Sequence, residues 1–154
     1  MIRSTHTLIL LVKTSIFIIR RYKMNKDIEK RFIETFIVKN KKDRLLFELS
    51  TNKRRSGIAR FSHDAQDLIK PERILYRGTD LFSDRIISIA EKQGVQGMCC
   101  ILAYNQDIDT KTCGLNEALD VVLGNGMPAI IICDKLVIIE TEQCFGTPMR
   151  YILR

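Results

Sequence analysis

The amino-acid sequence predicts an α/β fold, in which a mixed sheet of about five strands carries packed helices and follows an N-terminal helical subdomain. In the front half of the chain, apolar residues recur at helical spacing. In the back half, short apolar runs alternate with amphipathic segments, as strands and helices do when they follow one another. No linker rich in Pro, Gly or Ser divides residues 24–154. We therefore expect one globular domain with a helical part at 24–70 and a βαβαβββ part at 71–154.

Four helical segments are expected in the front half. The first covers residues 26–38, because its apolar side chains fall on one stripe of a helix. That stripe consists of Ile28, Phe32, Ile33, Phe36 and Ile37. Three shorter helices follow. One covers 43–49, the next ends at about residue 60, and the last covers 65–69. The last of them ends before Pro71, since proline disfavours α geometry in the residue before it.

The back half is expected to hold five strands and two helices. The strands are residues 74–76, 98–103, 129–133, 136–139 and 151–153. One helix begins at 79–80, ends at Gly94 and should bury Phe82 and Ile86, and the other covers 115–123. We expect the βαβαβ portion to pair in parallel with right-handed crossovers. The two-residue connection Asp134-Lys135 should close an antiparallel hairpin.

Residues 1–23 differ from the rest of the chain in charge. They carry five basic side chains and no acidic one, so they supply +5 of the formal net charge of +7. One interpretation is an upstream extension before a natural start at Met24, because Asn25 can cap a helix that begins there. The alternative is a membrane anchor whose basic cluster keeps the domain in the cytoplasm, although residues 4–19 fall short of the ~20 that span a bilayer.

Cysteine and glycine spacing gives no sign of a bound cofactor. The five cysteines are an odd number, and no two of them have C-x-x-C spacing. Both histidines, His6 and His63, lie far from every cysteine in sequence, so a structural zinc site is not expected. The glycines at 94–97 and 124–126 lack the spacing of a P-loop or a dinucleotide fingerprint. We expect no cofactor, and free thiols in a cytoplasmic protein.

Two patterns leave open a thiol- or metal-dependent hydrolase as the first alternative function. Cys113 stands just before a predicted helix, whose dipole would favour a thiolate, and His63 would be its base if the fold brings them together. Asp107 and Asp109 follow the most apolar strand, where a D-x-D pattern holds Mg²⁺ in some phosphotransferases. Each pattern also fits a plainer interpretation, namely a small residue near a helix start and two solvated acids in a loop.

A basic stretch within residues 39–60 is a candidate for contacts with phosphate groups or with a partner. The side chains in question are Lys41, Lys42, Lys53, Arg54 and Arg55. Acidic residues interrupt the stretch, and no aromatic side chain is spaced for base stacking. Weak nucleic-acid binding is therefore the second alternative function.

The leading hypothesis is a small cytoplasmic, non-enzymatic protein that binds another protein. Residues 26–60 carry a net charge of +6 and residues 61–154 a net charge of −4, a division that favours steering of a charged partner. Antidote and immunity proteins, which block toxins, are bacterial domains of comparable size, and they supply an analogy without a sequence match. Membrane contact is expected only if residues 1–23 are made and insert.

Overall fold

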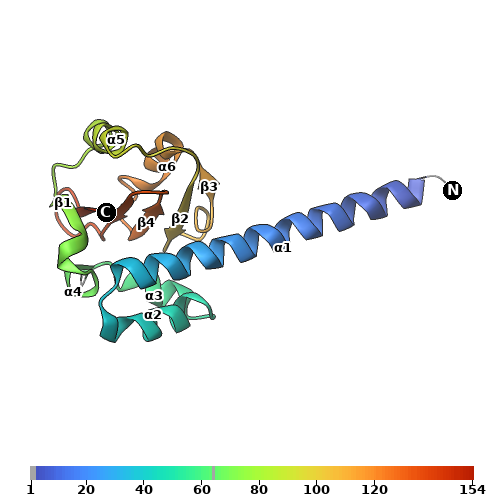
Figure 1. Ribbon diagram of the computed structural model, residues 1–154, viewed down its shortest axis with the longest axis horizontal. Coiled ribbons are helices and arrows are strands. Elements are labelled where there is room, and N and C mark those ends of the chain that lie inside the picture. The colour runs from blue at the N-terminus through green and yellow to red at the C-terminus, as the bar shows by residue number, and fades with distance from the viewer. Residues whose placement is uncertain (1–2, 64) are drawn as a thin grey trace.

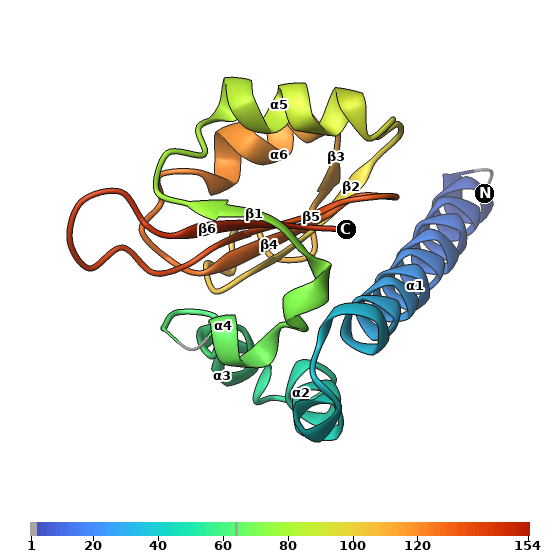
Figure 2. The same cartoon turned by 60° about the vertical axis from the view of Figure 1, so that its left-hand side comes forward.

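The computed structural model of the chain describes residues 3–63 and 65–154, which fold into three layers (Figures 1 and 2). A sheet of six strands forms the middle layer. Figure 2 shows one face of the sheet covered by α5 (Ser83–Lys92) and α6 (Leu115–Val122), with α2 (Lys42–Leu49), α3 (Arg54–Ala59) and α4 (Ala65–Leu68) on the other side. The predicted α/β class and the helical N-terminal part are confirmed.

The first helix, α1 (Arg3–Phe36), is continuous, and it begins much earlier than the predicted 26–38. Residues 3–25 contain neither Pro nor Gly, so nothing in them interrupts helical geometry. Figure 1 shows the N-terminal half of α1 running away from the rest of the domain. Its C-terminal end is fixed, because the N–H of Lys70 donates to the C=O of Phe36 at 2.8 Å and Ile37 forms a β-bridge with Ile69.

The remaining front-half helices lie within one residue of their predicted bounds, and two 3₁₀ turns, η1 (Lys39–Lys41) and η2 (Pro71–Arg73), flank them. Helices α2 and α3 approach each other closely at Gly57, where an added Cβ would lie 3.0 Å from the Cβ of Glu48. The buried carboxylate of Glu48 accepts two hydrogen bonds from Arg60, at 2.6 and 2.7 Å, and one from Arg44. This carboxylate therefore ties α2 to the end of α3.

The six strands are β1 (Ile74–Gly78), β2 (Cys99–Ala103), β3 (Thr112–Cys113), β4 (Ala129–Ile132), β5 (Val137–Glu140) and β6 (Arg150–Leu153). They are ordered β1-β6-β5-β4-β2-β3, and each neighbouring pair is antiparallel. All five predicted strands are present, and the hairpin of β4 and β5 is confirmed. The predicted parallel pairing of the βαβαβ portion is wrong, and so is the mixed character of the sheet.

The short strand β3 explains the reversal. After β2, the chain turns through residues 104–111 and returns antiparallel to it, with Cys113 opposite Cys99. Helix α6 therefore starts from the opposite end of the sheet, and β4 pairs with β2 in the antiparallel sense. Two residues of strand in a polar stretch give no period-2 pattern, so the sequence did not predict β3.

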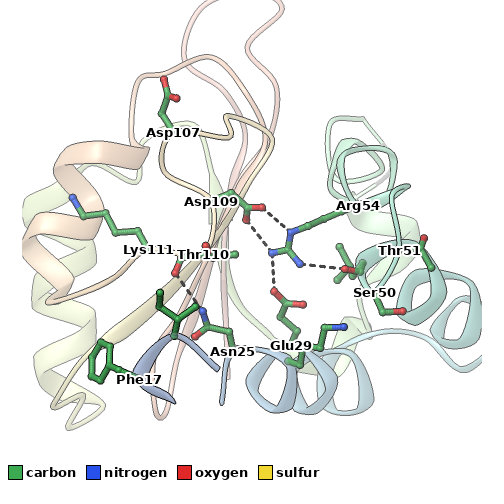
Figure 3. Close-up of a pocket in the computed structure, with 13 residues that line it drawn as sticks. Phe17, Asn25, Glu29, Ser50, Thr51, Arg54, Asp107, Asp109, Thr110 and Lys111 are labelled. Carbon is green, nitrogen blue, oxygen red and sulfur yellow. Dashed lines mark hydrogen bonds and ion pairs between the residues drawn. The ribbon is translucent and has the colours of Figure 1, made fainter. Parts of the chain in front are cut away.

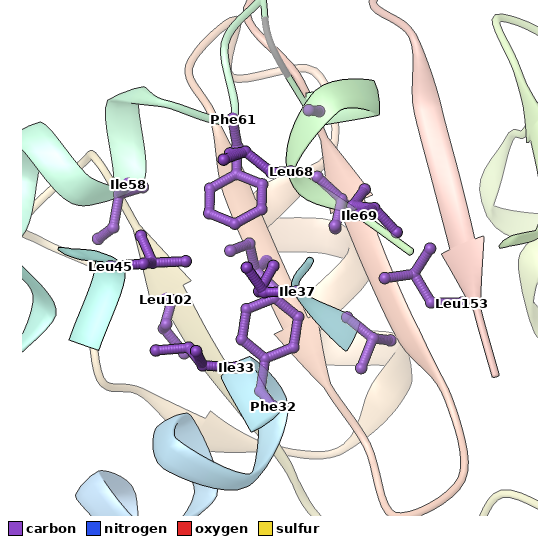
Figure 4. Close-up of a cluster of buried hydrophobic side chains, with 14 of the residues drawn as sticks. Phe32, Ile33, Ile37, Leu45, Ile58, Phe61, Leu68, Ile69, Leu102 and Leu153 are labelled. Carbon is purple, nitrogen blue, oxygen red and sulfur yellow. The ribbon is translucent and has the colours of Figure 1, made fainter. Parts of the chain in front are cut away.

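Both faces of the sheet are covered, which explains why β2 and β4 are apolar throughout. In β2, Cys100 and Leu102 face the layer of α1 to α4, whereas Ile101 and Ala103 face α5 and α6. Figure 4 shows Leu102 among the side chains of the first of these layers. The other labelled members of that cluster are Phe32, Ile33, Ile37, Leu45, Ile58, Phe61, Leu68, Ile69 and Leu153.

One expected core position is wrong. Phe82 precedes α5 as its N-cap and is 57% exposed, because α5 begins at Ser83, later than predicted. Its neighbour Leu81 is buried in its place. Ile86 is fully buried, as expected.

A buried ion pair holds the C-terminal strand against the α5 and α6 face. Arg150 in β6 donates from Nε to Oε2 of Glu140 at 2.8 Å and from Nη1 to the C=O of Leu81 at 2.8 Å. Glu140 also accepts the N–H of Gly124, which follows α6. Burial raises the pKa of Glu140, while Arg150 acts in the opposite direction. This pair satisfies both charges within the fold.

Candidate functional site

The first candidate site is a pocket of about 630 Å³ where α1, α3 and the β2–β3 loop meet (Figure 3). Its polar lining comes from distant parts of the chain and includes Asn25, Glu29, Arg54 and Asp109. Phe17, from the projecting part of α1, lies at one side of it. The pocket is therefore lined by three candidate site residues that the sequence indicated, Arg54, Asp107 and Asp109.

Arg54 occupies the centre of this site. It donates from Nε to Oδ2 of Asp109 at 2.7 Å and from Nη2 to Oδ1 of Asp109 at 2.9 Å. Its Nη2 also lies 2.7 Å from Oε1 of Glu29 in α1, and its Nη1 donates to the C=O of Leu49. The side chains of Glu29 and Asp109 are 8% and 14% exposed, so two carboxylates shielded from solvent share one guanidinium.

The pKa of Arg54 follows from these contacts. Burial alone would lower it, but the hydrogen bonds and charges of Asp109 and Glu29 outweigh burial and raise it. Arg54 therefore stays charged, and its donors are occupied within the protein. The predicted contact of Arg54 with a phosphate group or a partner would have to replace these ion pairs.

The loop that carries Asp109 is unusual in its backbone. Thr110 has φ of 66°, a left-handed conformation that is rare for a β-branched residue. The buried side chain of Asn25 lies against it, with Nδ2 donating to the C=O of Thr110 at 3.4 Å and Oδ1 accepting from the Cys100 thiol at 3.7 Å. The sequence predicted only a helix cap at Asn25, whereas this residue lies inside α1 and contacts the loop.

The structure separates the two acids of the predicted metal site. Asp109 faces Arg54 and also accepts the N–H of Ala103, whereas Asp107 points away from it in Figure 3 and is exposed. Among residues 3–63 and 65–154, no group of three or more His, Cys, Asp or Glu side chains is arranged to hold a metal ion. The D-x-D pattern here supplies one acid to an ion pair and one to the surface.

Cys113 and His63 belong to different layers. Cys113 is buried in the cluster beneath α5 and α6, and burial raises the pKa of its thiol, opposite to what a nucleophilic thiolate requires. His63 lies in the connection between α3 and α4, on the other side of the sheet, with Nε2 3.4 Å from Oε2 of Glu142. The structure does not bring the two predicted catalytic residues together.

The other nominated basic residues mostly contact their own subdomain. Lys42 donates to the C=O of Glu34 at 2.7 Å, and Lys53 lies over the ring of Phe47. Arg55 stacks on Tyr104, with Cζ 4.2 Å from the ring centroid, and donates to the C=O of the same residue. Lys41 is exposed at the surface.

A second pocket, of about 590 Å³, lies between α1 and the end of the sheet where the β4–β5 hairpin turns. Its lining combines apolar residues of α1 with three cysteines, Cys99, Cys100 and Cys133. Four cations also line it, namely Arg31, Arg73, Lys135 and Arg154. The sequence predicted free thiols, and the spacing of these cysteines in the chain gives no sign that they meet.

The N-terminal half of α1 presents an apolar surface that nothing in the described structure covers. Nine apolar side chains between residues 8 and 19 are 46% to 69% exposed. They are Leu8, Ile9, Leu10, Leu11, Val12, Ile16, Phe17, Ile18 and Ile19. No helix among the described residues is long and apolar enough to cross a membrane. A contiguous apolar surface of this kind usually marks an interaction site.

Comparisons of the chain with family models, with curated proteins and with solved structures found no match.

Proposed function

We propose that this is a cytoplasmic, non-enzymatic protein that binds another protein, and that the partner covers residues 8–19 of α1. The observation that carries the proposal is the set of nine exposed apolar side chains in this segment. A helix that is apolar on all sides is ordinarily buried. Figure 1 places this segment away from the domain core, so its own chain does not bury it.

The distribution of polar residues favours a protein groove over a lipid surface. Lys13, Thr14 and Ser15 follow one another, so their directions differ by about 100° each and they form no single polar face. An in-plane amphipathic helix needs such a face. The hydroxyls of Thr14 and Ser15 donate to the C=O groups of Leu10 and Leu11, at 2.8 and 2.9 Å, so neither opposes burial in an apolar groove.

Charge identifies the chemistry of the partner. Residues 1–23 carry five basic side chains and no acidic one, so two copies of this helix would repel each other in either orientation. A second copy of the chain is therefore a poor occupant. A groove that is apolar inside and acidic at its rim matches the segment, and it would pair with Lys13 and Arg20.

Photo-crosslinking from a single position tests this proposal in cells that make the full chain. A photoreactive residue at Leu10, which is 69% exposed, should crosslink to one protein. The same residue at Phe145, which is 98% exposed in the connection between β5 and β6, is the matched control and should not. A crosslink to a second copy of this chain, or to lipid alone, would overturn the proposal.

Substitutions then separate the apolar and the ionic contributions. Leu8, Val12 and Ile19 lie within about 40° of one another around the helix, and changing all three to Gln should abolish the crosslink from position 10. Lys13→Glu should weaken it, because the acidic rim would repel the new charge. Lys92→Glu, an exposed change on α5, should leave it unchanged.

A further inference from the structure

Three cysteines lie side by side across three neighbouring strands. Cys113 in β3 stands opposite Cys99 in β2. Because Cys100 pairs with Ile132 in β4, the next position along the ladder places Cys133 opposite Cys99 on its other side. All three side chains belong to the cluster that faces α5 and α6. Cys99 could therefore meet either neighbour.

The backbone hydrogen bonds decide which neighbour it meets. Ile101 exchanges hydrogen bonds with the β3 side, donating to Lys111 at 2.9 Å and accepting from Thr110 at 2.8 Å. The backbone groups of Cys99, two residues earlier, face the same way, since these directions alternate along a strand. The N–H of Cys133 likewise turns away from β2 and donates to Leu136 at 2.8 Å.

Cys99 and Cys133 are consequently a non-hydrogen-bonded pair of the antiparallel ladder. Such pairs have Cα atoms about 4.5 Å apart, against about 5.5 Å for hydrogen-bonded pairs, and their side chains lie closer. That separation is within the range of roughly 4.4 to 6.8 Å that a disulfide requires. The two Sγ atoms are 2.7 Å apart, and both cysteines are free thiols in this structure.

Cys99 and Cys133 are among the residues that line the second pocket. Cys133 is 8% exposed and Cys99 is 1% exposed, which excludes bulky reagents more effectively than small ones. The hydrogen bond between the thiols lowers the pKa of Cys99 and raises that of Cys133.

We propose that Cys99 and Cys133 are a reversible dithiol–disulfide pair that is oxidised by hydrogen peroxide or a small hydroperoxide. The thiolate of one of the two cysteines attacks one peroxide oxygen, an S–O bond forms, the O–O bond breaks, and the departing hydroxide or alkoxide takes a proton to leave as water or an alcohol. The sulfur of the other cysteine then attacks the oxidised Sγ, displacing hydroxide, which leaves as water with the proton of the attacking thiol. Two thiols lose two electrons in all, and hydrogen peroxide becomes two waters, whereas a hydroperoxide becomes one water and one alcohol.

The test uses the fully reduced full-length protein and hydrogen peroxide as the probe. After brief oxidation, the protein is denatured and its remaining thiols are alkylated with N-ethylmaleimide. The expected product has two fewer alkylated cysteines and a mass lower by two hydrogens before alkylation. Dithiothreitol should restore all five thiols. Fragment-ion mapping of the disulfide-linked peptide from the wild-type protein should place the bond between Cys99 and Cys133. This measurement does not depend on any substituted protein.

Two variants confirm the assignment of the sulfurs. Cys113→Ser should still form the disulfide, whereas Cys133→Ser should not, and near-ultraviolet circular dichroism checks that both are folded. The exposed Cys144 is the internal reference for simple accessibility. The proposal fails if the wild-type protein links Cys99 to Cys113. It also fails if peroxide oxidises Cys144 completely while Cys99 and Cys133 remain reduced.

Discussion

Arg54 and Asp109 are 55 residues apart in the chain, yet they form a two-point ion pair, with Nε donating to Oδ2 at 2.7 Å and Nη2 to Oδ1 at 2.9 Å. The same guanidinium lies 2.7 Å from Glu29. One cation therefore joins α1, α3 and the β2–β3 loop. Because the three side chains are largely shielded from solvent, the stability of this junction depends on all of them together.

Replacing Arg54 with Met should lower the free energy of unfolding by about 3–5 kcal/mol, because it leaves Glu29 and Asp109 without their shared cation. Arg44→Met is the matched control. Arg44 also pairs with a glutamate, but its side chain is 68% exposed, so its loss should cost at most about 1 kcal/mol. Urea denaturation of both variants measures the difference. Equal losses would show that the Arg54 cluster is no stronger than a surface pair.

The acid limb of the stability curve should depend on Glu48. Its hydrogen bonds from Arg60, with those from Arg44, lower the pKa of Glu48 below its usual value of 4.5. A carboxyl group with a lowered pKa in the folded state stabilises the fold above pH 4.5 and loses that contribution as the pH falls through the folded pKa. Wild-type protein should therefore lose more stability below pH 4.5 than Glu48→Gln does.

Thermal unfolding between neutral pH and pH 3 gives this comparison, and Glu91→Gln, an exposed change on α5, is its control. The control should follow the wild-type curve. Parallel curves for wild type and Glu48→Gln would show that the contacts of Glu48 do not distinguish its charged form from its neutral form.

Local patterns predicted most of the elements, because each depends on residues close together in the chain. The stripe that contains Phe32 and Ile33 identified the buried face of α1, and the connection Asp134-Lys135 identified the β4–β5 hairpin. Pairing between strands that are far apart in the sequence was harder to predict. The two residues of β3 determine the direction in which the following helix and strands run. They are too few to give a periodic hydrophobic pattern.

The candidate sites were harder to predict for the same physical reason. Arg54 and Asp109 were both singled out, but for separate roles, since nothing in the sequence brings residues 54 and 109 together. Cys99 and Cys133 meet only because β4 returns next to β2 in one particular register. A residue type and its spacing therefore indicate what a side chain can do, whereas the topology decides which partner it meets.

The centre of β4 should be among the most sensitive positions of the core. Ile131 is fully buried between β2 and β5, facing α5 and α6, so Ile131→Ala should cost about 2–5 kcal/mol through lost burial and the cavity that remains. Phe145→Ala, at a side chain that is 98% exposed, should change stability by at most about 0.5 kcal/mol. Chemical denaturation of both variants provides the test, and a loss below about 1 kcal/mol at Ile131 would contradict its central place.

The rate at which each cysteine of the native protein is alkylated should follow the exposure of its side chain. Cys113 should not react faster than its exposure predicts. Cys144 is the exposed cysteine and should react first with iodoacetamide near neutral pH. Cys113 should react slowly, since burial both hides its thiol and raises the thiol's pKa. Peptide mapping over time gives the order. Fast labelling at Cys113 that His63→Ala slows would support the thiol-hydrolase alternative.

A chain that begins at Met24 should fold with the stability of the full chain but lose its partner. The cut leaves Asn25 and Glu29 in place, and with them the contacts to Thr110 and Arg54. The residues removed include the exposed apolar segment 8–19, whose side chains add little to the core. The free energy of unfolding should therefore change by less than about 1 kcal/mol, as for other changes at exposed sites.

Partner binding is the second measurement on the chain that begins at Met24. If residues 8–19 are the contact surface, the shortened protein should no longer co-purify with the protein that crosslinks to position 10, although its circular dichroism shows an intact sheet and core. The two measurements separate the role of the segment in folding from its role in recognition. Aggregation or a large loss of stability would place residues 1–23 within the fold. Undiminished partner binding by the stable shortened chain would move the contact surface onto the domain itself.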